Sequence, residues 1–248
     1  MPSRWVVPLD RVDVSRVELV HLHAAISGWF DGAAVAHDAD LKPYSISPVR
    51  RLGRGCAVEV GLLDAESEWY FQCHAVPGTE LRFGRQFTAV SAPPVLLLDR
   101  GWEQLARFTT DRAWTVRFET PASFRRGERT SPWPAPESLL RGLGQRWARW
   151  SGLGARDLSP QVTRAIWVSD LDGASDVVVL GRDDRRVHYS GFVGRVRYQC
   201  DDDAAAAEVG PLFALADFAG VGAATTKGLG VTRLEPTWQP ASQRITGT

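Results

Sequence analysis

The chain has 248 residues, of which 44% are hydrophobic and 23% charged, as in an ordinary globular protein. Its formal net charge is zero, which argues against binding of polyanions through bulk charge but leaves a local site open. No apolar run is long enough to span a membrane, the N-terminus lacks the features of a secretion signal, and three widely spaced cysteines predict neither disulfides nor a zinc site. We therefore expect a cytoplasmic protein with one large domain or two small ones.

Hydrophobic patterning in the N-terminal half predicts strands that alternate with helices. Ser15 and Glu18 match a capping box, so a helix should begin there and run to about Trp29. The stretch DAES at 64–67 predicts a hairpin turn between two strands. The predicted elements are strands at 4–9, 56–63, 68–75, 80–90 and 113–120, helices at 15–29 and 99–108, and a loop at 31–55. Their order is roughly the βαββαβ order of the ferredoxin-like split βαβ motif.

Pro121 and the proline-rich stretch after it predict a boundary, with one domain over residues 1–121 and another over 122–248. Leu139, Leu143 and Trp147 repeat at four-residue spacing and predict a helix. The predicted elements here are helices at 138–150 and 203–218, the second broken at Gly210-Pro211, and strands at 163–169, 176–180, 185–199 and 231–235. Two similar α+β halves indicate a tandem arrangement.

Residues 220–230 read GVGAATTKGLG and form a glycine-rich loop after the last predicted helix. The loop fails the P-loop pattern because Lys227 is followed by Gly228, and it fails the dinucleotide pattern because Thr225 replaces the third glycine. Exposed amides beside threonines and a lysine would suit a phosphodiester backbone. Taken alone, however, the loop is better explained as a helix C-cap at Gly220 followed by a tight turn.

Several stretches together resemble a known family. They are HDADLKPYSISPV (37–49), FETPASFRRG (118–127), PWPAPESLLRGLGQRW (132–147), GFVGRVRY (191–198) and PLFALADFAGVGAATTKGLG (211–230). In this order they resemble the CRISPR-associated repeat RNA endoribonucleases of the RAMP superfamily. The resemblance covers nearly the whole chain, and its most specific part is the glycine-rich loop near the C-terminus.

The resemblance implies an α+β fold of two tandem ferredoxin-like (RRM-like) domains with a C-terminal glycine-rich loop. It implies cleavage of CRISPR repeats in precursor RNA, without a metal or other cofactor, by attack of the 2′-hydroxyl on the adjacent phosphate. The products would be a 2′,3′-cyclic phosphate and a 5′-hydroxyl. The expected partner is CRISPR repeat RNA and no membrane is involved, while effector-complex subunits and a homodimer stay open as further partners.

The same resemblance assigns the catalytic candidates. His37 lies where the family's catalytic histidine falls, and imidazole is the side chain best suited to move a proton near neutral pH. Lys42 would stabilise the charge that develops on the phosphate. Tyr44 would orient the nucleophile or stack on a base, although a place in the core explains this aromatic residue better. His23 is the second choice for the catalytic histidine.

The predicted RNA-binding residues come from the glycine-rich loop and from arginine clusters. Arg195 and Arg197 fall on one face of a predicted strand, where they would follow phosphates. Arg125 and Arg126 belong to a cluster that is otherwise explained as solvated surface. The loop contributes Gly220, Gly222, Thr225, Thr226, Lys227, Gly228 and Gly230.

Two other functions fit the sequence. The chain would be a non-catalytic RNA-binding subunit of the same superfamily, or an unrelated α+β protein whose glycine-rich loop is only a cap. The presence of both His37 and Lys42 in one predicted loop favours the enzyme.

Overall fold

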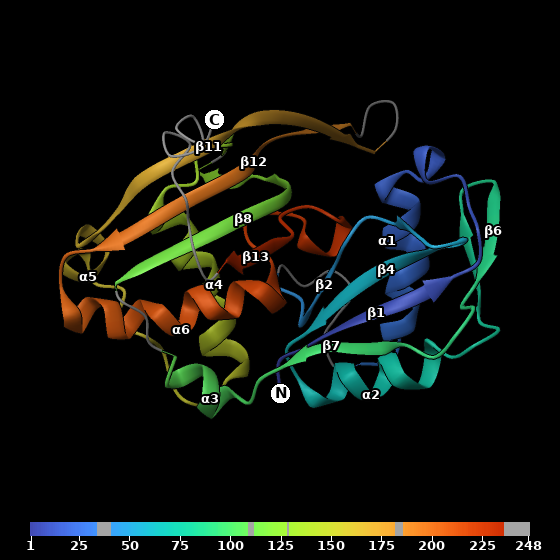
Figure 1. Cartoon of the computed structure of the whole chain (residues 1–248), viewed down its shortest axis with the longest axis horizontal. Coiled ribbons are helices and arrows are strands. Elements are labelled where there is room, and N and C mark those ends of the chain that lie inside the picture. Colours follow the sequence, from blue (N-terminus) through green and yellow to red (C-terminus); the bar gives the residue numbers. More distant parts are fainter. Residues whose placement is uncertain (34–40, 109–111, 128, 182–185, 236–248) are drawn as a thin grey trace, which may run out of the picture.

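The computed structural model describes residues 1–33, 41–108, 112–127, 129–181 and 186–235, and it contains two large antiparallel sheets side by side (Figure 1). The first sheet has the strand order β2-β4-β1-β7, with β3 paired to β4. Its strands are β1 (Ser3–Leu9), β2 (Tyr44–Ile46), β3 (Arg50–Leu52), β4 (Gly55–Leu62) and β7 (Val95–Asp99). Around them lie η1 (Val14–Arg16), α1 (Leu19–Ser27), η2 (Gly28–Phe30), α2 (Ala65–His74) and a hairpin of β5 (Glu80–Phe83) and β6 (Gln86–Ala89).

The second sheet has the order β11-β12-β8-β13 and is joined to the first through the short helix α3 (Trp102–Ala106). Its strands are β8 (Ala113–Ala122), β11 (Ile166–Leu180), β12 (Val187–Cys200) and β13 (Thr232–Glu235). The remaining elements are a hairpin of β9 (Phe124–Arg126) and β10 (Arg129–Ser131), helices α4 (Pro136–Trp150), α5 (Pro160–Arg164) and α6 (Asp203–Ala219), and the turn η4 (Thr225–Lys227). No helix in these ranges is long and apolar enough to cross a membrane.

Both sheets repeat one topology. In the first, β1, α1, β2, β4, α2 and β7 follow one another, and in the second the succession is β8, α4, β11, β12, α6 and β13. Each sheet places its last strand beside its first and its third beside its second, as the split βαβ motif requires. The predicted α+β fold is therefore confirmed, and the strand order of each sheet is the one expected of a ferredoxin-like domain.

The strand pairing bears on the domain boundary that was predicted at residue 121. Strand β8 pairs with β12 and β13, so residues from Ala113 onward lie in the second sheet. The proline-rich stretch that suggested the boundary follows the first strand of the second sheet. We therefore propose that the domains divide between β7 and β8.

Several predictions in the first domain are wrong. Residues 68–74 belong to α2 and neither to a strand nor to a hairpin, because the Asp64 side chain accepts the Ser67 N–H at 2.7 Å and caps a helix. The strand predicted at 80–90 is the hairpin of β5 and β6, and the loop predicted at 31–55 contains β2 and β3. The predicted capping box at Ser15 is also absent. Ser15 instead donates to Asp13 within η1, and α1 begins four residues later at Leu19.

Two further predictions in the second domain are wrong. The two strands predicted at 163–169 and 176–180 are one continuous strand, β11, with an irregularity between Val168 and Asp170. Helix α6 continues through Pro211 where a break was predicted. Nearly all of its residues from Val209 onward are buried, so tertiary packing offsets the hydrogen bond that proline cannot donate.

Candidate functional site

The glycine-rich loop lies between the two sheets, where it packs against the first domain (Figure 1). Its turn η4 contacts both α1 and β2. Gly228 adopts φ +87°, and a Cβ there would lie 3.0 Å from Leu19 Cδ2 and 3.5 Å from Pro48 Cγ. Only glycine fits this backbone position without displacing its neighbours. The loop therefore forms a junction between the domains.

Several backbone N–H groups of the loop already donate hydrogen bonds within the protein. The N–H of Val221 donates to the Gly230 carbonyl at 2.8 Å, and that of Ala223 donates to the Ser123 carbonyl at 2.8 Å. Gly230 in turn donates to the Pro121 carbonyl at 3.0 Å. These amides hold the loop in shape, so they do not contribute to the anion-binding backbone that the sequence predicted.

The predicted RNA-binding residues of the loop fall into two groups. Gly220, Thr225, Gly228 and Gly230 are buried. Gly222, Thr226 and Lys227 are partly exposed. Because the second group reaches solvent, the predicted RNA contacts of the loop are narrowed from seven residues to these three.

His23 links α1 directly to this loop. Its Nδ1 lies 2.9 Å from the carbonyl oxygen of Thr226. A carbonyl oxygen only accepts hydrogen bonds, so Nδ1 carries the hydrogen and donates it. The contact fixes the ring's orientation and, when the ring is neutral, its tautomer.

The other catalytic candidates precede or belong to β2. His37 falls in residues 34–40, outside the described residues, whereas Lys42 is half-buried two residues before β2. Tyr44 is buried and stacks on Phe30 with ring centroids 4.0 Å apart. Burial raises the pKa of the Tyr44 hydroxyl to about 12, so the side chain stays neutral near pH 7. This packing favours the core role for Tyr44.

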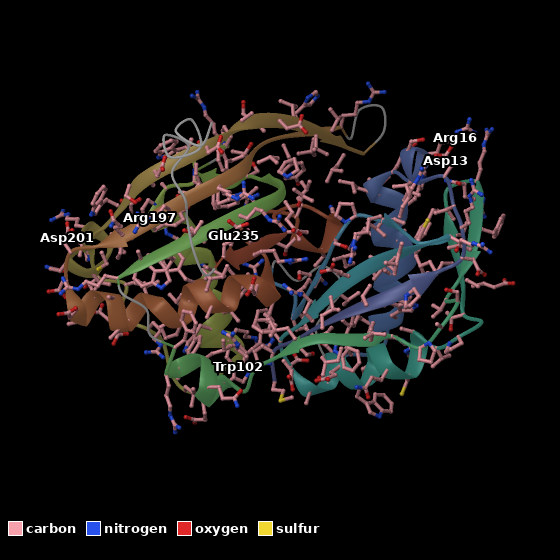
Figure 2. The ribbon with its side chains drawn as sticks, in the orientation of Figure 1. Asp13, Arg16, Trp102, Arg197, Asp201 and Glu235 are labelled. Carbon is pink, nitrogen blue, oxygen red and sulfur yellow. The ribbon has the colours of Figure 1, made fainter. Side chains whose placement is uncertain are left out.

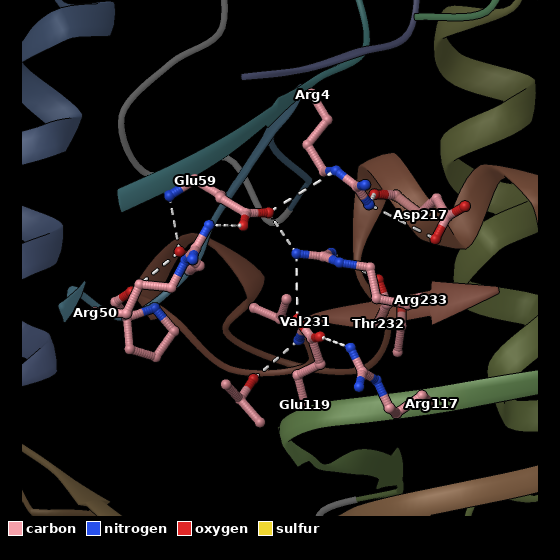
Figure 3. A network of polar contacts seen from close by, with 12 residues as sticks. Arg4, Arg50, Glu59, Arg117, Glu119, Asp217, Val231, Thr232 and Arg233 are labelled. Carbon is pink, nitrogen blue, oxygen red and sulfur yellow. Dashed lines mark hydrogen bonds and ion pairs between the residues drawn. The ribbon is translucent and has the colours of Figure 1, made fainter. Parts of the chain in front are cut away.

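A row of alternating charges connects the sheets at a second place, and Figure 3 shows its part from Arg50 to Arg117. We call it the charge ladder; in order it comprises Arg50, Glu59, Arg233, Glu119, Arg117, Glu235 and Arg195. Glu59 of β4 is its central carboxylate, with Oε1 2.7 Å from the Arg50 guanidinium and Oε2 in contact with Arg233 of β13. Arg4 approaches the same carboxylate at 3.8 Å and also pairs with Asp217 of α6. The ladder thereby joins β3 of the first domain to β12 of the second.

The predicted arginine face of the second sheet is present. Arg195 and Arg197 are partly exposed on β12, whereas Val196 and Tyr198 between and beside them are buried. Figure 2 labels Arg197 on this strand. Arg195 is held by Glu235 at 2.9 Å and borders an open groove of about 480 Å³ that also includes Arg117 and Asp172. The carboxylates along this groove offset much of its positive charge.

The predicted pair Arg125 and Arg126 lies apart from the loop in sequence, on β9. Arg125 is exposed, and the Arg126 side chain lies outside the described part of the structure. Among the described residues, no contact between Arg125 and the glycine-rich loop is found, so the structure does not place Arg125 in the junction. Its assignment to RNA binding stays a prediction.

Two structural residues of the site were missed in the sequence. Arg146 is a buried cation of α4 that donates to the Thr225 hydroxyl at 3.1 Å, and Glu59 organises the charge ladder. Arg146 lies three residues after Leu143 and next to Trp147, on the apolar face of its helix. A charge on an apolar stripe was the available signal. Nothing in the sequence pairs Glu59 with Arg233.

The chain is similar to known proteins in sequence and in fold. Residues 116–232 match the family described as CRISPR-associated endoribonuclease Cas6, and no curated protein matches the chain. A product complex of Cas6 (TTHA0078) has a TM-score of 0.79 at 23% identity, over 94% of this chain and 99% of that one. A product complex of Cas6 (TTHB231) from Thermus thermophilus gives 0.73 at 22%, over 95% and 99%.

A more distant structure is described as a RAMP protein binding different RNA substrates. It has a TM-score of 0.59 at 12% identity, over 94% of this chain and 99% of that one. The fold is therefore the one shared by RAMP-type proteins. More particularly, the chain is similar in sequence and fold to the Cas6 endoribonucleases, and the resemblance noted in the sequence is confirmed.

Proposed function

We propose that the chain is a metal-independent endoribonuclease that cuts CRISPR repeats in precursor RNA to release guide RNA. The observation that carries this proposal is the junction itself. The chain has only two lysines, and Lys42 precedes the strand that packs on η4, while Lys227 ends η4. Lysine is a compact cation suited to phosphate, so both lysines belong to one phosphate-binding junction.

The proposed reaction is an internal transesterification of the RNA. The 2′-oxygen forms a bond to the adjacent phosphorus, and the bond from phosphorus to the 5′-oxygen breaks. A base takes the 2′-hydroxyl proton and an acid gives a proton to the leaving 5′-oxygen, so a 2′,3′-cyclic phosphate and a 5′-hydroxyl result. Because DNA lacks the 2′-hydroxyl, this chemistry rejects DNA.

The residues take the following roles in the proposal. His37 moves the proton, and Lys42 and Lys227 stabilise the negative charge that grows on the phosphate. His23 is the second candidate for proton transfer, and its contact with Thr226 keeps it beside the loop. Tyr44 supports β2 through its packing on Phe30.

The similar structures support this assignment from outside the chain. Cas6 (TTHA0078) is described in a product complex, in a complex with a substrate mimic and as a histidine-to-alanine mutant. Cas6 (TTHB231) is also described in a product complex. By analogy, this chain should bind a repeat RNA and depend on a histidine.

The test is a cleavage assay of purified protein with its repeat RNA in the presence of EDTA. Wild-type protein should cut at one position, and His37→Ala should bind RNA normally while cutting at least about a hundredfold more slowly. A matched His23→Ala variant decides between the histidines, since only replacement of the proton-transfer residue should abolish cutting. A 2′-deoxy substitution upstream of the scissile phosphate should block cleavage.

The alternative, a non-catalytic RNA-binding subunit, makes a different prediction in the same assay. It binds the repeat RNA without cutting it under any ionic condition. The hydrogen-bonded amides and buried glycines of the junction do not distinguish the two functions, but the presence or absence of a cleavage product does. Failure both to bind and to cut would contradict both proposals.

A further inference from the structure

Arg146 of α4 is a buried cation beneath the glycine-rich loop. Only 7% of the residue is exposed, and burial lowers the pKa of its guanidinium to about 10. It donates to the Thr225 hydroxyl at 3.1 Å and to the Gly142 carbonyl at 3.3 Å. No ion pair of Arg146 with a carboxylate is found among the described residues. Because burying an unpaired charge is unfavourable, its retention calls for a specific role.

The hydroxyl that accepts the hydrogen bond from Arg146 belongs to Thr225, the first residue of the turn η4. Thr225 follows Ala224, whose φ of 59° lies in the left-handed region that side chains other than glycine rarely adopt. Such a conformation persists where surrounding contacts enforce it. The Arg146–Thr225 hydrogen bond is one of these contacts, and it attaches the turn to the buried face of α4.

The next residue along the turn carries the contact with α1. The Thr226 carbonyl accepts the hydrogen of His23 Nδ1 at 2.9 Å. A continuous set of contacts therefore runs from Arg146 in the second domain, through Thr225 and Thr226, to His23 in the first. A shift of Thr225 would move the carbonyl that orients the imidazole.

We propose that Arg146 and Thr225 are positioning residues that set the placement of Lys227 for RNA cleavage, and that the orientation of His23, the second candidate for proton transfer, follows the same turn. The effect on cleavage rests on the proposed function. The link from Arg146 to His23 does not, because it consists of hydrogen bonds seen in the structure. Neither residue touches the reacting atoms. Their effect is transmitted through one hydroxyl and one backbone carbonyl.

Paired substitutions at Thr225 test this link. Thr225→Val keeps the shape of the side chain and removes the hydroxyl, whereas Thr225→Ser keeps the hydroxyl. Thr232→Val is the matched control, because it removes another buried threonine hydroxyl, which donates to the Ala216 carbonyl at 2.8 Å. Arg146→Lys and Arg146→Met examine the donor side, and circular dichroism verifies that each variant folds.

Two measurements are made on each variant. Nitrogen-15 NMR of the histidine rings without RNA reports whether His23 Nδ1 carries the hydrogen. Single-turnover cleavage and RNA binding are then measured separately. We expect Thr225→Val to shift the His23 signal and slow cleavage about tenfold with little change in RNA affinity, and Thr225→Ser and Thr232→Val to resemble wild type.

The outcomes separate the inference from the proposed function. Unchanged His23 signals in Thr225→Val would overturn the link whether or not the wild type cuts RNA. Unchanged cleavage by Thr225→Val, in a wild type that cuts, would overturn the positioning role. If the wild type cuts nothing, the proposed function fails, and the NMR result alone then supports or overturns the coupling of Thr225 to His23. If Arg146→Met fails to fold, Thr225→Val still decides.

Discussion

The charge ladder joins the two domains through long side chains, whereas the glycine-rich loop and Gly61 join them through backbone atoms. Along the ladder, charged groups meet at distances such as 2.7 Å between Arg50 and Glu59 and 3.2 Å between Arg233 and Glu119. At Gly61 a single added carbon would overlap the Phe218 carbonyl oxygen, and at Gly228 it would press on Leu19 and Pro48. The charge ladder should weaken when salt is raised, and it should tolerate small movements of its side chains. The backbone contacts should be insensitive to salt and should not tolerate such movements.

The proposed site lies at the second kind of contact. Reactive groups must be held within fractions of an ångström, and close backbone packing resists displacement better than flexible arginines do. The ladder would then set the general orientation of the sheets, and the loop would set the local geometry. Substitutions at the two places distinguish these roles.

The largest effect is expected at Gly61 of β4. A Cβ there would lie 2.0 Å from the Phe218 carbonyl oxygen and 2.6 Å from Ser45 Oγ, which itself donates to that carbonyl. Gly61→Ala should lower the free energy of unfolding by about 3 kcal/mol, because β4 must move away from α6. Urea denaturation measures the loss, and Gly101→Ala, with no neighbour closer than 3.9 Å, is the control. Equal stability of the two variants would contradict the close packing.

Glu59→Gln should have the next largest effect. The change leaves Arg4, Arg50 and Arg233 without their shared carboxylate charge, while the Glu59 side chain is only 11% exposed. We expect a loss of about 2 kcal/mol, reduced from that of a fully buried pair because Arg50 is half exposed. Exposed Glu80→Gln is the control.

A double-mutant cycle with Arg233→Met sharpens this prediction. If Glu59 acts through Arg233, the two substitutions should cost less together than the sum of their separate effects. Additive losses would show that the ladder does not carry the coupling between the domains.

Glu235→Gln, nearer the exposed end of the ladder, should cost only about 0.5 kcal/mol. Its partners Arg117 and Arg195 are 41% and 36% exposed, so solvent and salt screen the interaction. The cost should nearly vanish when salt is raised from about 0.1 M to about 1 M. The loss caused by Gly61→Ala should not change over the same range, and a salt-dependent loss there would break the comparison between the two contacts.

The sequence predicted the repeated βαββαβ order but assigned it partly to other residues. The predicted second helix at 99–108 is the connecting helix α3, and the true second helix, α2, was predicted as a strand. An apparent alternation over residues 68–75 suggested a strand there, yet Trp69 is exposed and the buried Ser67 and Phe71 lie four residues apart. Local alternation was therefore misleading, since burial follows from packing against a distant partner.

Likewise, part of the candidate site could be predicted from residues close together in the sequence, and part depends on residues that are far apart in it. The loop was recognisable because glycines and a lysine stand close together in the sequence. The contacts that build the junction join residues 79 apart for Arg146 and Thr225 and 174 apart for Glu59 and Arg233. No periodicity encodes such pairs. Arg146 could still have been singled out, because the spacing of Leu139, Leu143 and Trp147 places it on the buried face of α4.

The smallest effect is expected for Asp217→Asn, and it isolates the cost of the buried charge beside the ladder. Burial raises the pKa of the Asp217 carboxyl, outweighing its hydrogen bond from the Leu234 N–H and the charges of Arg4 and Arg233. A carboxyl with a raised folded-state pKa stabilises the fold fully below its unfolded pKa, and that contribution is lost as pH rises through the folded pKa. Stability of the wild type relative to Asp217→Asn should therefore fall as pH rises above about 4. The amide still accepts from Leu234, so at neutral pH the two proteins should differ by less than about 0.5 kcal/mol. A wild type that instead gains stability over the variant with rising pH would show that Arg4 and Arg233 outweigh burial, and that the ladder extends favourably to Asp217.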